Sequence, residues 1–451
     1  MDLVEFNRFK VVLESVRRLL HRGATPNLRN ILSKLHPADV AQLFKFLSPA
    51  ETYQLFDVLD DHEQAAQVLK EALPEHRMII LERIDKERLS QILNALPSDD
   101  ATDILEDLPE ELRAEIIARL GIRQSASVEE HLSYPEGSAG RVMVTHFLAL
   151  PEDMTIADAI EEVRRAKKSE VFYVYVVDDE KRLKGVLSLR QLVMANPSSR
   201  LGEIMVTDVV KVPPTADQED VAKIVARYNL IAVPVVDSEE KLIGIVTVDD
   251  VIDIMREEAT EDLLKLAGTA EEDITTSSSL KSVRLRFPWL MITWVGGILS
   301  SVVVAAFSPT IERFIYVAAF MPIIAGMAGN VGSQSVAVVI RGLATGRIDA
   351  SQLWKILFKE MRSGILLGAA YGILLAAFAW VRFGNPLLGA SVGISICAAM
   401  TLSASWGTLL PLAASKLGAD PAFISGPSMA TTTDVAAMAI YLGVATALLN
   451  I

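Results

Sequence analysis

Asp434 is a carboxylate in the middle of the last apolar stretch of the chain, which runs from Phe423 to Leu449. An aspartate at the centre of a membrane-spanning helix costs roughly 3 kcal/mol on insertion, so it needs polar surroundings. Thr431 and the two threonines after it lie directly before Asp434, and Pro427 frees a backbone carbonyl that lipid cannot solvate. This pattern indicates a wetted path through the membrane rather than a lipid-facing helix.

A second polar motif, Pro322 to Ser335, lies in another apolar stretch. Asn330 and Gln334 are four residues apart, which places both amides on one face of a helix. Helix packing with interhelical hydrogen bonds is one interpretation, but a motif that served packing alone would need no amides. The glycines of the motif recur at helical spacing and allow another backbone to approach closely: Gly326, Gly329 and Gly332.

Acidic residues follow one face of a helix predicted from Asp249 to about Ile274. Like charges three and four residues apart destabilise an isolated helix by a few tenths of a kcal/mol per pair, so a positive partner is expected to relieve them. A solvated helix face is the alternative. Asp99 and Asp103 form a separate acidic pair outside this helix. Capping of a helix N-terminus explains the pair about as well as metal binding does. The acidic face consists of Asp250, Asp253, Glu257 and Glu261, with Glu258 beside it.

The composition restricts the possible classes of function. Of the 451 residues 51% are apolar, and these concentrate after Pro288, whereas the acidic excess behind the net charge of −14 lies before that point. A soluble part this acidic repels nucleic acid and attracts cations. The lone cysteine, Cys397, lies in an apolar run, which predicts no disulfide framework and a cytosolic soluble part. Met1 to Leu20 has the pattern of a charged amphipathic helix rather than of a signal peptide.

Residues 1–130 are predicted to form an all-α superhelical N-domain. Short amphipathic helices alternate with proline-containing turns, and a weak repeat relates Leu35–Pro49 to Leu96–Pro109. Units of this kind bury each other's apolar faces when they stack. A helical scaffold is the expected role of this domain.

Residues 138–199 and 200–258 form a clearer duplication, in which each half has the pattern strand, helix, strand, strand, helix. The pair resembles tandem α+β CBS domains, a family that often binds adenosine nucleotides between its halves. In that family a Thr or Ser and an acid that follows it closely hold the ribose, and the second half has Thr-Val-Asp-Asp from Thr247 to Asp250. The first half has Ser-Leu-Arg-Gln from Ser188 and lacks the acid. The resemblance implies at most one site for ATP or another adenosine nucleotide, with Thr247 and Asp250 as candidate ligands.

Five apolar stretches each reach the length of roughly 20 residues that a membrane-spanning helix needs. Their approximate bounds are Pro288–Phe307, Phe314–Ile340, Ser363–Val381, Leu387–Ala414 and Phe423–Leu449. Basic residues gather before the first span, between the second and third, and after the fourth, with Arg313 and Arg382 on the other side. By the positive-inside rule the N-terminus is cytosolic and the C-terminus external.

The chain is therefore predicted to be a multi-domain membrane protein in which an acidic helix connects soluble domains to five transmembrane helices. The predicted ranges are 1–130 for the N-domain, 138–199 and 200–258 for the CBS domains, 249–280 for the connecting helix and 285–451 for the transmembrane domain.

The order of these parts and the Pro-Ile-Ile…Gly-Asn-x-Gly-x-Gln run around Asn330 resemble the MgtE family of magnesium channels over the entire chain. The resemblance implies a homodimer in a bacterial-type cell membrane that imports Mg²⁺ through a pore at the subunit interface. Asp434 matches the family's pore aspartate, and Asp420 matches an acid near the cytosolic mouth. The second and fifth spans are implied to line the pore, with Gly329, Asn330, Gln334 and Thr431 as lining residues.

The same resemblance implies regulation by cytosolic Mg²⁺, with the connecting helix as a plug that gates the pore. One departure is Asn229, which stands where a family member can have an acid. The implied regulatory metal ligands are Asp99, Asp103, Glu219, Asp250, Asp253, Glu258 and Glu261.

Mg²⁺ prefers octahedral oxygen ligands and gives up its water reluctantly, so a selective pore should offer few direct carboxylates. Two Asp434 side chains facing each other across a dimer axis meet this description. A transporter of Co²⁺ or Mn²⁺ is an alternative, although no thiolate or imidazole near the pore favours a softer metal. A membrane-anchored nucleotide or Mg²⁺ sensor without transport is another.

An enzyme is not expected from this sequence. All six histidines precede Leu148, so none lies in a predicted span to form a His-Glu-x-x-His metal site. An intramembrane aspartyl protease would need two deep carboxylates, and Asp434 is the one that the spans place at depth. The expected partners are the lipid bilayer and a second copy of the chain, with no nucleic acid and no other protein partner predicted.

Overall fold

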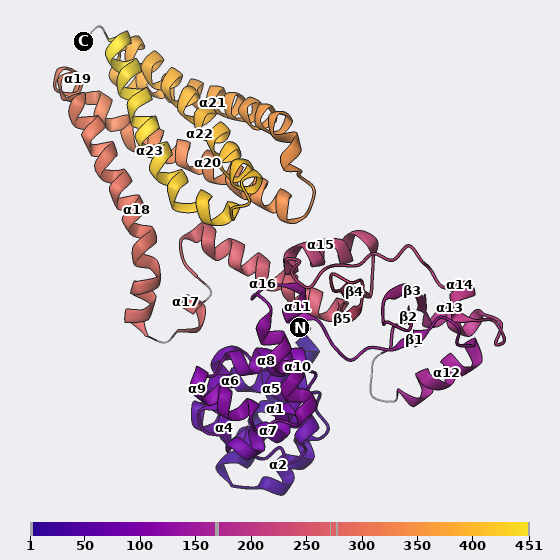
Figure 1. The fold of residues 1–451 in the computed structure, drawn as a ribbon. Coiled ribbons are helices and arrows are strands. Elements are labelled where there is room, and N and C mark those ends of the chain that lie inside the picture. The colour runs from indigo at the N-terminus through magenta and orange to yellow at the C-terminus, as the bar shows by residue number, and fades with distance from the viewer. Residues whose placement is uncertain (1–2, 167–170, 271, 277, 450–451) are drawn as a thin grey trace. The chain divides into compact units, whose positions relative to one another are not determined.

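The computed structural model describes residues 3–166, 171–270, 272–276 and 278–449. The chain divides into two compact units, Met1–Met255 and Arg256–Ile451. Figure 1 gives the elements of both units. Positions 1–2, 167–170, 271, 277 and 450–451 of the predicted domain ranges lie outside the described residues.

The N-terminal part of the first unit is a stack of short helices around one apolar core, as the superhelical pattern predicts. Proline occupies the first positions of several helices, where its missing N–H costs nothing. Phe44, Phe56 and Leu69 are fully buried between the layers. The helices are α1 (Leu3–His21), α2 (Thr25–Leu32), α3 (Pro37–Phe44), α4 (Pro49–Asp57), α5 (His62–Glu71), α6 (Pro74–Leu81), α7 (Lys86–Leu93), α8 (Ser98–Glu106), α9 (Glu110–Ile117) and α10 (Ile122–Ser133).

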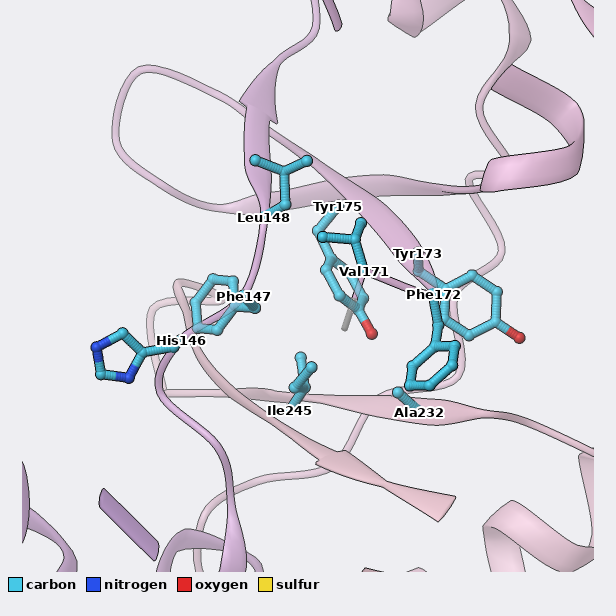
Figure 2. A pocket seen from close by; sticks show the side chains of 9 residues that line it. All are labelled: His146, Phe147, Leu148, Val171, Phe172, Tyr173, Tyr175, Ala232 and Ile245. Atoms are coloured by element: carbon cyan, nitrogen blue, oxygen red, sulfur yellow. The ribbon is translucent and has the colours of Figure 1, made fainter. Parts of the chain in front are cut away.

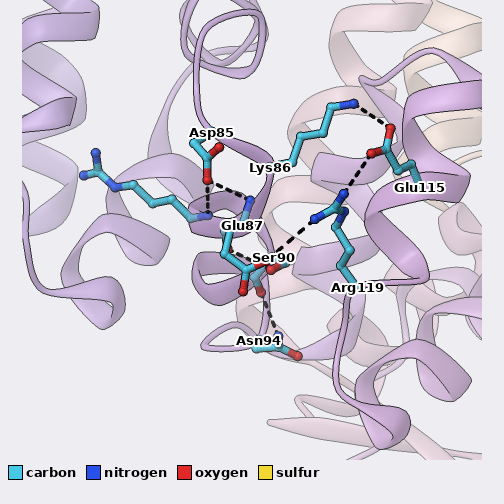
Figure 3. Close-up of polar contacts among 8 residues, drawn as sticks. Asp85, Lys86, Glu87, Ser90, Asn94, Glu115 and Arg119 are labelled. Carbon is cyan, nitrogen blue, oxygen red and sulfur yellow. Dashed lines mark hydrogen bonds and ion pairs between the residues drawn. The ribbon is translucent and has the colours of Figure 1, made fainter.

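Exposed polar contacts join neighbouring helices of this stack. Glu115 of α9 accepts from Lys86 of α7 at 2.5 Å and from Arg119 at 3.1 Å. Figure 3 draws both contacts as dashed lines. Arg119 also lies 3.7 Å from Glu87, and Asp85 caps the N-terminus of α7. Solvent-exposed pairs of this kind contribute little to stability, so the apolar core carries most of it.

The two halves of the predicted CBS pair follow. The first contains α11 (Ala139–Val142), β1 (Ala149–Pro151), α12 (Ile156–Arg165), β2 (Tyr173–Val177), β3 (Leu183–Ser188) and α13 (Leu189–Met194). The second contains α14 (Leu201–Ile204), α15 (Gln218–Tyr228), β4 (Ala232–Val236), β5 (Leu242–Thr247) and the start of α16 (Val248–Ala267). In the first sheet β1 is parallel to β2 and β2 antiparallel to β3, while β4 and β5 are antiparallel.

The first strand predicted for the second half is reduced to one bridge. Val212 pairs with Val235 in parallel, but no strand forms around it. Pro213 and Pro214 follow, and neither can donate a hydrogen bond to a sheet. The halves also exchange their leading segments, because Val144 pairs with Ile245 and Val206 pairs with Val186.

The acidic connecting segment is not one helix to Ile274, as predicted, but is broken after Ala267. Gly268 has φ +74°, a left-handed conformation that a residue with a Cβ adopts only with strain. Its N–H donates to the carbonyl of Lys265, and the next N–H, of Thr269, donates to Leu264. These two bonds are the Schellman pattern that ends a helix. A short helix, α17 (Glu272–Thr275), follows the break.

The described residues of the second unit contain five helices that are long and apolar enough to cross a membrane, in agreement with the predicted number. The central helix α22 contacts α20, α21 and α23, and its contact face carries small buried residues such as Ser391, Ser395 and Ser403. The helices are α18 (Ser279–Ala306), α20 (Met321–Ala344), α21 (Leu353–Phe383), α22 (Pro386–Lys416) and α23 (Pro421–Leu448), with α19 (Ser308–Arg313), η1 (Ile315–Phe320) and η2 (Ala350–Gln352) between them (Figure 1).

The third of these helices begins ten residues before the predicted span. The prediction started at Ser363 because Lys355, Lys359 and Arg362 interrupt the apolar pattern. Hydropathy marks the part of a helix that crosses lipid and not the whole helix, so the charged first turns of α21 were missed.

Candidate functional site

Asp434 lies half-buried on α23, the last transmembrane helix, within one chain. Asn330 and Gln334 lie on the exposed face of α20, whereas Ile324, Ala328 and other residues of the opposite face are buried against the rest of the bundle. Helices α20 and α23 contact each other. Among the described residues, Asp434 makes no hydrogen bond with either amide in the single chain.

The glycines of the α20 motif differ in their surroundings. A Cβ on Gly332 would lie 2.1 Å from Met429 Cε, and a Cβ on Gly407 of α22 would lie 2.5 Å from the Gly332 carbonyl oxygen. Gly332 therefore admits a neighbouring backbone, as predicted. Gly326 and Gly329 instead face open space in the single chain.

Thr431, a predicted lining residue, is placed against the first transmembrane helix. Its hydroxyl oxygen lies 3.3 Å from the carbonyl oxygen of Ile292 in α18 and 3.1 Å from that of Pro427, and the two carbonyls share its one O–H donor. A Cβ on Gly296 of α18 would lie 2.3 Å from the Thr431 methyl carbon. In one chain Thr431 thus joins α23 to α18.

Asp420 caps the N-terminus of α23 and binds a lysine of the acidic helix. Its carboxylate accepts from the backbone N–H of Ala422 at 2.8 Å. The Lys265 ammonium lies 2.6 Å from Asp420 Oδ2 and 2.6 Å from Glu261 Oε1. Burial opposes ionisation of Asp420, but the Lys265 and backbone donors outweigh it and lower the pKa of Asp420.

The end of α16 is packed closely against the start of α23. A Cβ on Gly426 would lie 2.9 Å from the carbonyl oxygen of Lys265, so a larger residue there would separate the two helices. The start of α23 also contacts α18, where the Trp289 and Phe423 rings meet edge to face with centroids 4.7 Å apart. The acidic helix therefore ends in contact with the helix that carries Asp434.

In the first unit, carboxylates of α8 and of the start of α16 influence one another. Asp99 Oδ1 and Asp100 Oδ2 are buried and have no hydrogen-bond partner among the described residues. Burial is the main cause that raises the pKa values of Asp99, Asp100 and Asp250, the last to about 6. The Lys70 ammonium of α5 lies 2.9 Å from Asp100 Oδ1. Burial opposes its charge, yet the carboxylates of Asp100, Asp250 and Asp99 outweigh burial and raise the pKa of Lys70.

The other predicted regulatory residues are dispersed. Asp103 lies 2.6 Å from Arg77 Nη1, and Glu219 of α15 lies 3.1 Å from Lys223. Asp253 and Glu258 are on α16. Within the described ranges, no three His, Cys, Asp or Glu side chains are grouped closely enough to hold a metal ion together. Asn229, the departure from the family pattern, has φ +52° and ends α15 in a left-handed conformation, which asparagine tolerates.

A pocket lies between the two CBS halves. Figure 2 shows Phe147, Val171 and Tyr175 of the first half facing Ile245 of the second, with Tyr173 and Ala232 also in its lining. Thr247 is two residues after Ile245 on β5 and therefore points to the same face of the strand. Its hydroxyl donates to Asp250 Oδ2 at 2.5 Å, so the two candidate nucleotide ligands touch each other.

Family models match most of the chain. A "divalent cation transporter" model named MgtE covers residues 321–444, the "MgtE intracellular N domain" covers 35–137, and the CBS domain model covers 139–197 and 201–257. The magnesium transporter MgtE of Thermus thermophilus is 37% identical over 445 residues, which are 97% of this chain and 98% of the relative. The chain belongs to the MgtE family. The MgtE of Bacillus subtilis is 32% identical over 434 residues, 96% of both chains.

A solved MgtE structure resembles about half of this chain. The cytosolic domain of the Mg²⁺ channel MgtE, in complex with ATP, is 38% identical and superimposes with a TM-score of 0.51 over 54% of this chain and 99% of that chain. The predicted architecture of N-domain, CBS pair and transmembrane helices is confirmed by these matches. The MgtE relatives are named as transporters, which is a non-enzymatic role.

Sequence reasoning missed a buried carboxylate in this MgtE chain. Glu360 of α21 is 9% exposed and accepts a hydrogen bond from Ser335 of the α20 motif at 3.2 Å. A signal for it was present, because Glu360 lies at four-residue spacing from the glycines at 364, 368 and 372, whose face of α21 is buried. The pairing of Lys265 with Asp420 and of Lys70 with Asp100 was also missed.

Proposed function

We propose that this protein imports Mg²⁺ across a bacterial-type cell membrane through a path formed by two copies of the chain. The observation that carries the proposal is a carboxylate, Asp434, on a transmembrane helix that contacts the amide-bearing helix α20, in a chain of the MgtE family. Membership of the MgtE family supports Mg²⁺ as the substrate, because the related proteins are named magnesium transporters.

The exposed amides of α20 support the homodimer. Asn330 and Gln334 are exposed in the single chain, although polar side chains within a bilayer need polar surroundings. The open space beside Gly326 and Gly329 leaves room for another helix. We therefore place a second copy against this face of α20, where Asp434 from both chains, with Asn330, Gln334, Gly329 and Thr431, surrounds the ion.

The chemistry of this path suits a hydrated ion. Mg²⁺ dehydrates reluctantly, so a few carboxylates that contact its water shell, aided by amide and hydroxyl groups, recognise it without stripping all its water. Asp420 lies at the cytosolic mouth in this arrangement. The clustering of basic residues supports a cytosolic N-terminus and an external C-terminus.

We infer that cytosolic Mg²⁺ closes the path by binding acidic residues of the soluble domains and of α16. The buried carboxylate oxygens of Asp99 and Asp100 without a hydrogen-bond partner fit such a ligand, because an anionic oxygen removed from water requires a cation or a donor. The proposed ligands are Asp99, Asp103, Glu219, Asp250, Asp253, Glu258 and Glu261. The packing of α16 against Gly426 supports its role as the gate.

The test is Mg²⁺ uptake into liposomes that contain the full chain. We expect uptake down a gradient when Mg²⁺ on the cytosolic face is low, and at least tenfold slower uptake when it is high. A chain that carries no Mg²⁺ under either condition would leave the protein a sensor without transport.

We also propose that ATP or another adenosine nucleotide binds between the CBS halves, which the ATP complex of the related cytosolic domain supports. The Thr247→Ala change is expected to weaken ATP binding five- to tenfold, because one hydrogen bond to the ribose is worth about 1 kcal/mol. Isothermal titration of the full chain with ATP measures the change. Ser188→Ala is the matched control, because the first CBS half lacks the acid and is not expected to bind the nucleotide. Equal losses in both variants, or none in either, would contradict the assignment.

A further inference from the structure

Lys70 is a cation held among the carboxylates of the proposed regulatory site. Its ammonium lies 2.9 Å from Asp100 Oδ1, and it interacts electrostatically with Asp99 and Asp250 as well. These acids come from two elements, α8 and the start of α16, and Lys70 itself comes from a third, α5. The lysine therefore supplies positive charge where the proposed function places Mg²⁺.

We propose that Lys70 is a built-in counterion of the regulatory site, which occupies the carboxylates when Mg²⁺ is scarce and competes with Mg²⁺ for them. Lys70 then sets the Mg²⁺ concentration at which the soluble domains respond. The proposal rests on the regulatory role proposed above for Asp99 and Asp250.

The surroundings of Lys70 differ from those of a structural cation. Arg77, one helix further along, is 8% exposed in its side chain and is held by two carboxylates, those of Asp103 and Asp107. Lys70 is 33% exposed in its side chain and pairs with Asp100. A lysine head on a flexible four-carbon stem can move into water when a divalent ion takes its place.

Electrostatics gives the direction of the effect. Buried carboxylates without a cation repel one another, and Lys70 reduces that repulsion in the absence of metal. The same ammonium repels an arriving Mg²⁺ or must be displaced by it. Removal of the positive charge should therefore tighten Mg²⁺ binding. It should also destabilise the site in the absence of metal.

The experiment is Mg²⁺-dependent protection from protease, measured on the full chain in detergent with MgCl₂ alone as the probe. Lys70→Met is expected to lower the midpoint Mg²⁺ concentration at least tenfold, and Lys70→Arg, which keeps the charge, to leave it within threefold of wild type. Lys86→Met, which breaks the exposed pair with Glu115, is the matched control and should not change the midpoint. Thermal unfolding with and without MgCl₂ gives an independent readout of the same midpoint.

Lys70→Gln, which keeps a hydrogen-bond donor without the charge, replaces Lys70→Met if the latter does not fold. Folding of either variant only in the presence of MgCl₂ would support the competition, since the metal would then replace the missing charge. An unchanged or raised midpoint in a folded variant, or failure of both variants to fold at any Mg²⁺ concentration, would make Lys70 a structural residue and overturn the inference. A separate variant, Asp99→Asn with Asp250→Asn, tests the proposed regulatory site itself. If that site is wrong, this double variant keeps the wild-type midpoint, an outcome that is distinct from failure of the Lys70 inference.

Discussion

Asp434→Asn is expected to reduce Mg²⁺ uptake into liposomes at least tenfold, or to let monovalent cations pass. The substitution keeps the size of the side chain and removes the negative charge that attracts a divalent cation in the proposed path. Two such charges act together if the path lies on a dimer axis, so one substitution removes both. Uptake is measured at low Mg²⁺ on the cytosolic face, the condition under which the proposed gate is expected to be open.

Glu312→Gln is the matched control for this experiment. Glu312 is an exposed carboxylate of the same unit, in the short helix α19 between the first two spans, and should have no part in the path. Equal flux and selectivity in wild type and Asp434→Asn would remove Asp434 from the ion path. Equal losses in Glu312→Gln and Asp434→Asn would point to a general effect of charge on the protein.

Neutralising Asp99, Asp103, Asp250 and Asp253 together is expected to abolish Mg²⁺-dependent closure. Two unit charges about 4 Å apart interact by roughly 4 kcal/mol at an effective dielectric of 20, so unfilled facing carboxylates separate the elements that carry them and bound Mg²⁺ draws them together. The metal stabilises the closed state only by its differential affinity for that state, and this difference disappears with the ligands. Uptake should then stay high at high cytosolic Mg²⁺, and protease protection by Mg²⁺ should be lost.

The four aspartates are expected to contribute unequally to this loss of closure. Because Asp103 already pairs with Arg77, most of the loss is expected from Asp99 and Asp250. Glu110→Gln with Glu111→Gln removes two exposed acids from the same domain and serves as the control. Intact metal-dependent protection in the fourfold variant would contradict the assignment of these residues.

Local pattern was sufficient for much of the architecture. Five apolar stretches of bilayer length gave the five transmembrane helices, because apolar content over a window of about 20 residues reflects lipid burial directly. The duplication of residues 138–258 predicted the two CBS halves. The helix break at Gly268 also had a local signal, a glycine after an apolar stripe. The prediction missed the break because it followed the acidic pattern beyond this glycine.

The sequence alone determined which side chains are able to act on a cation: a carboxylate, Asp434, in an apolar helix, an amide pair at helical spacing, and an acidic helix before the membrane. Tertiary structure decided which charges meet. Lys265 and Asp420 are 155 residues apart in the chain and Lys70 and Asp100 are 30 apart, yet each pair forms an ion pair. The physical reason is that periodicity and hydropathy report on a residue's own segment, whereas the partner of a charge depends on how separate segments pack.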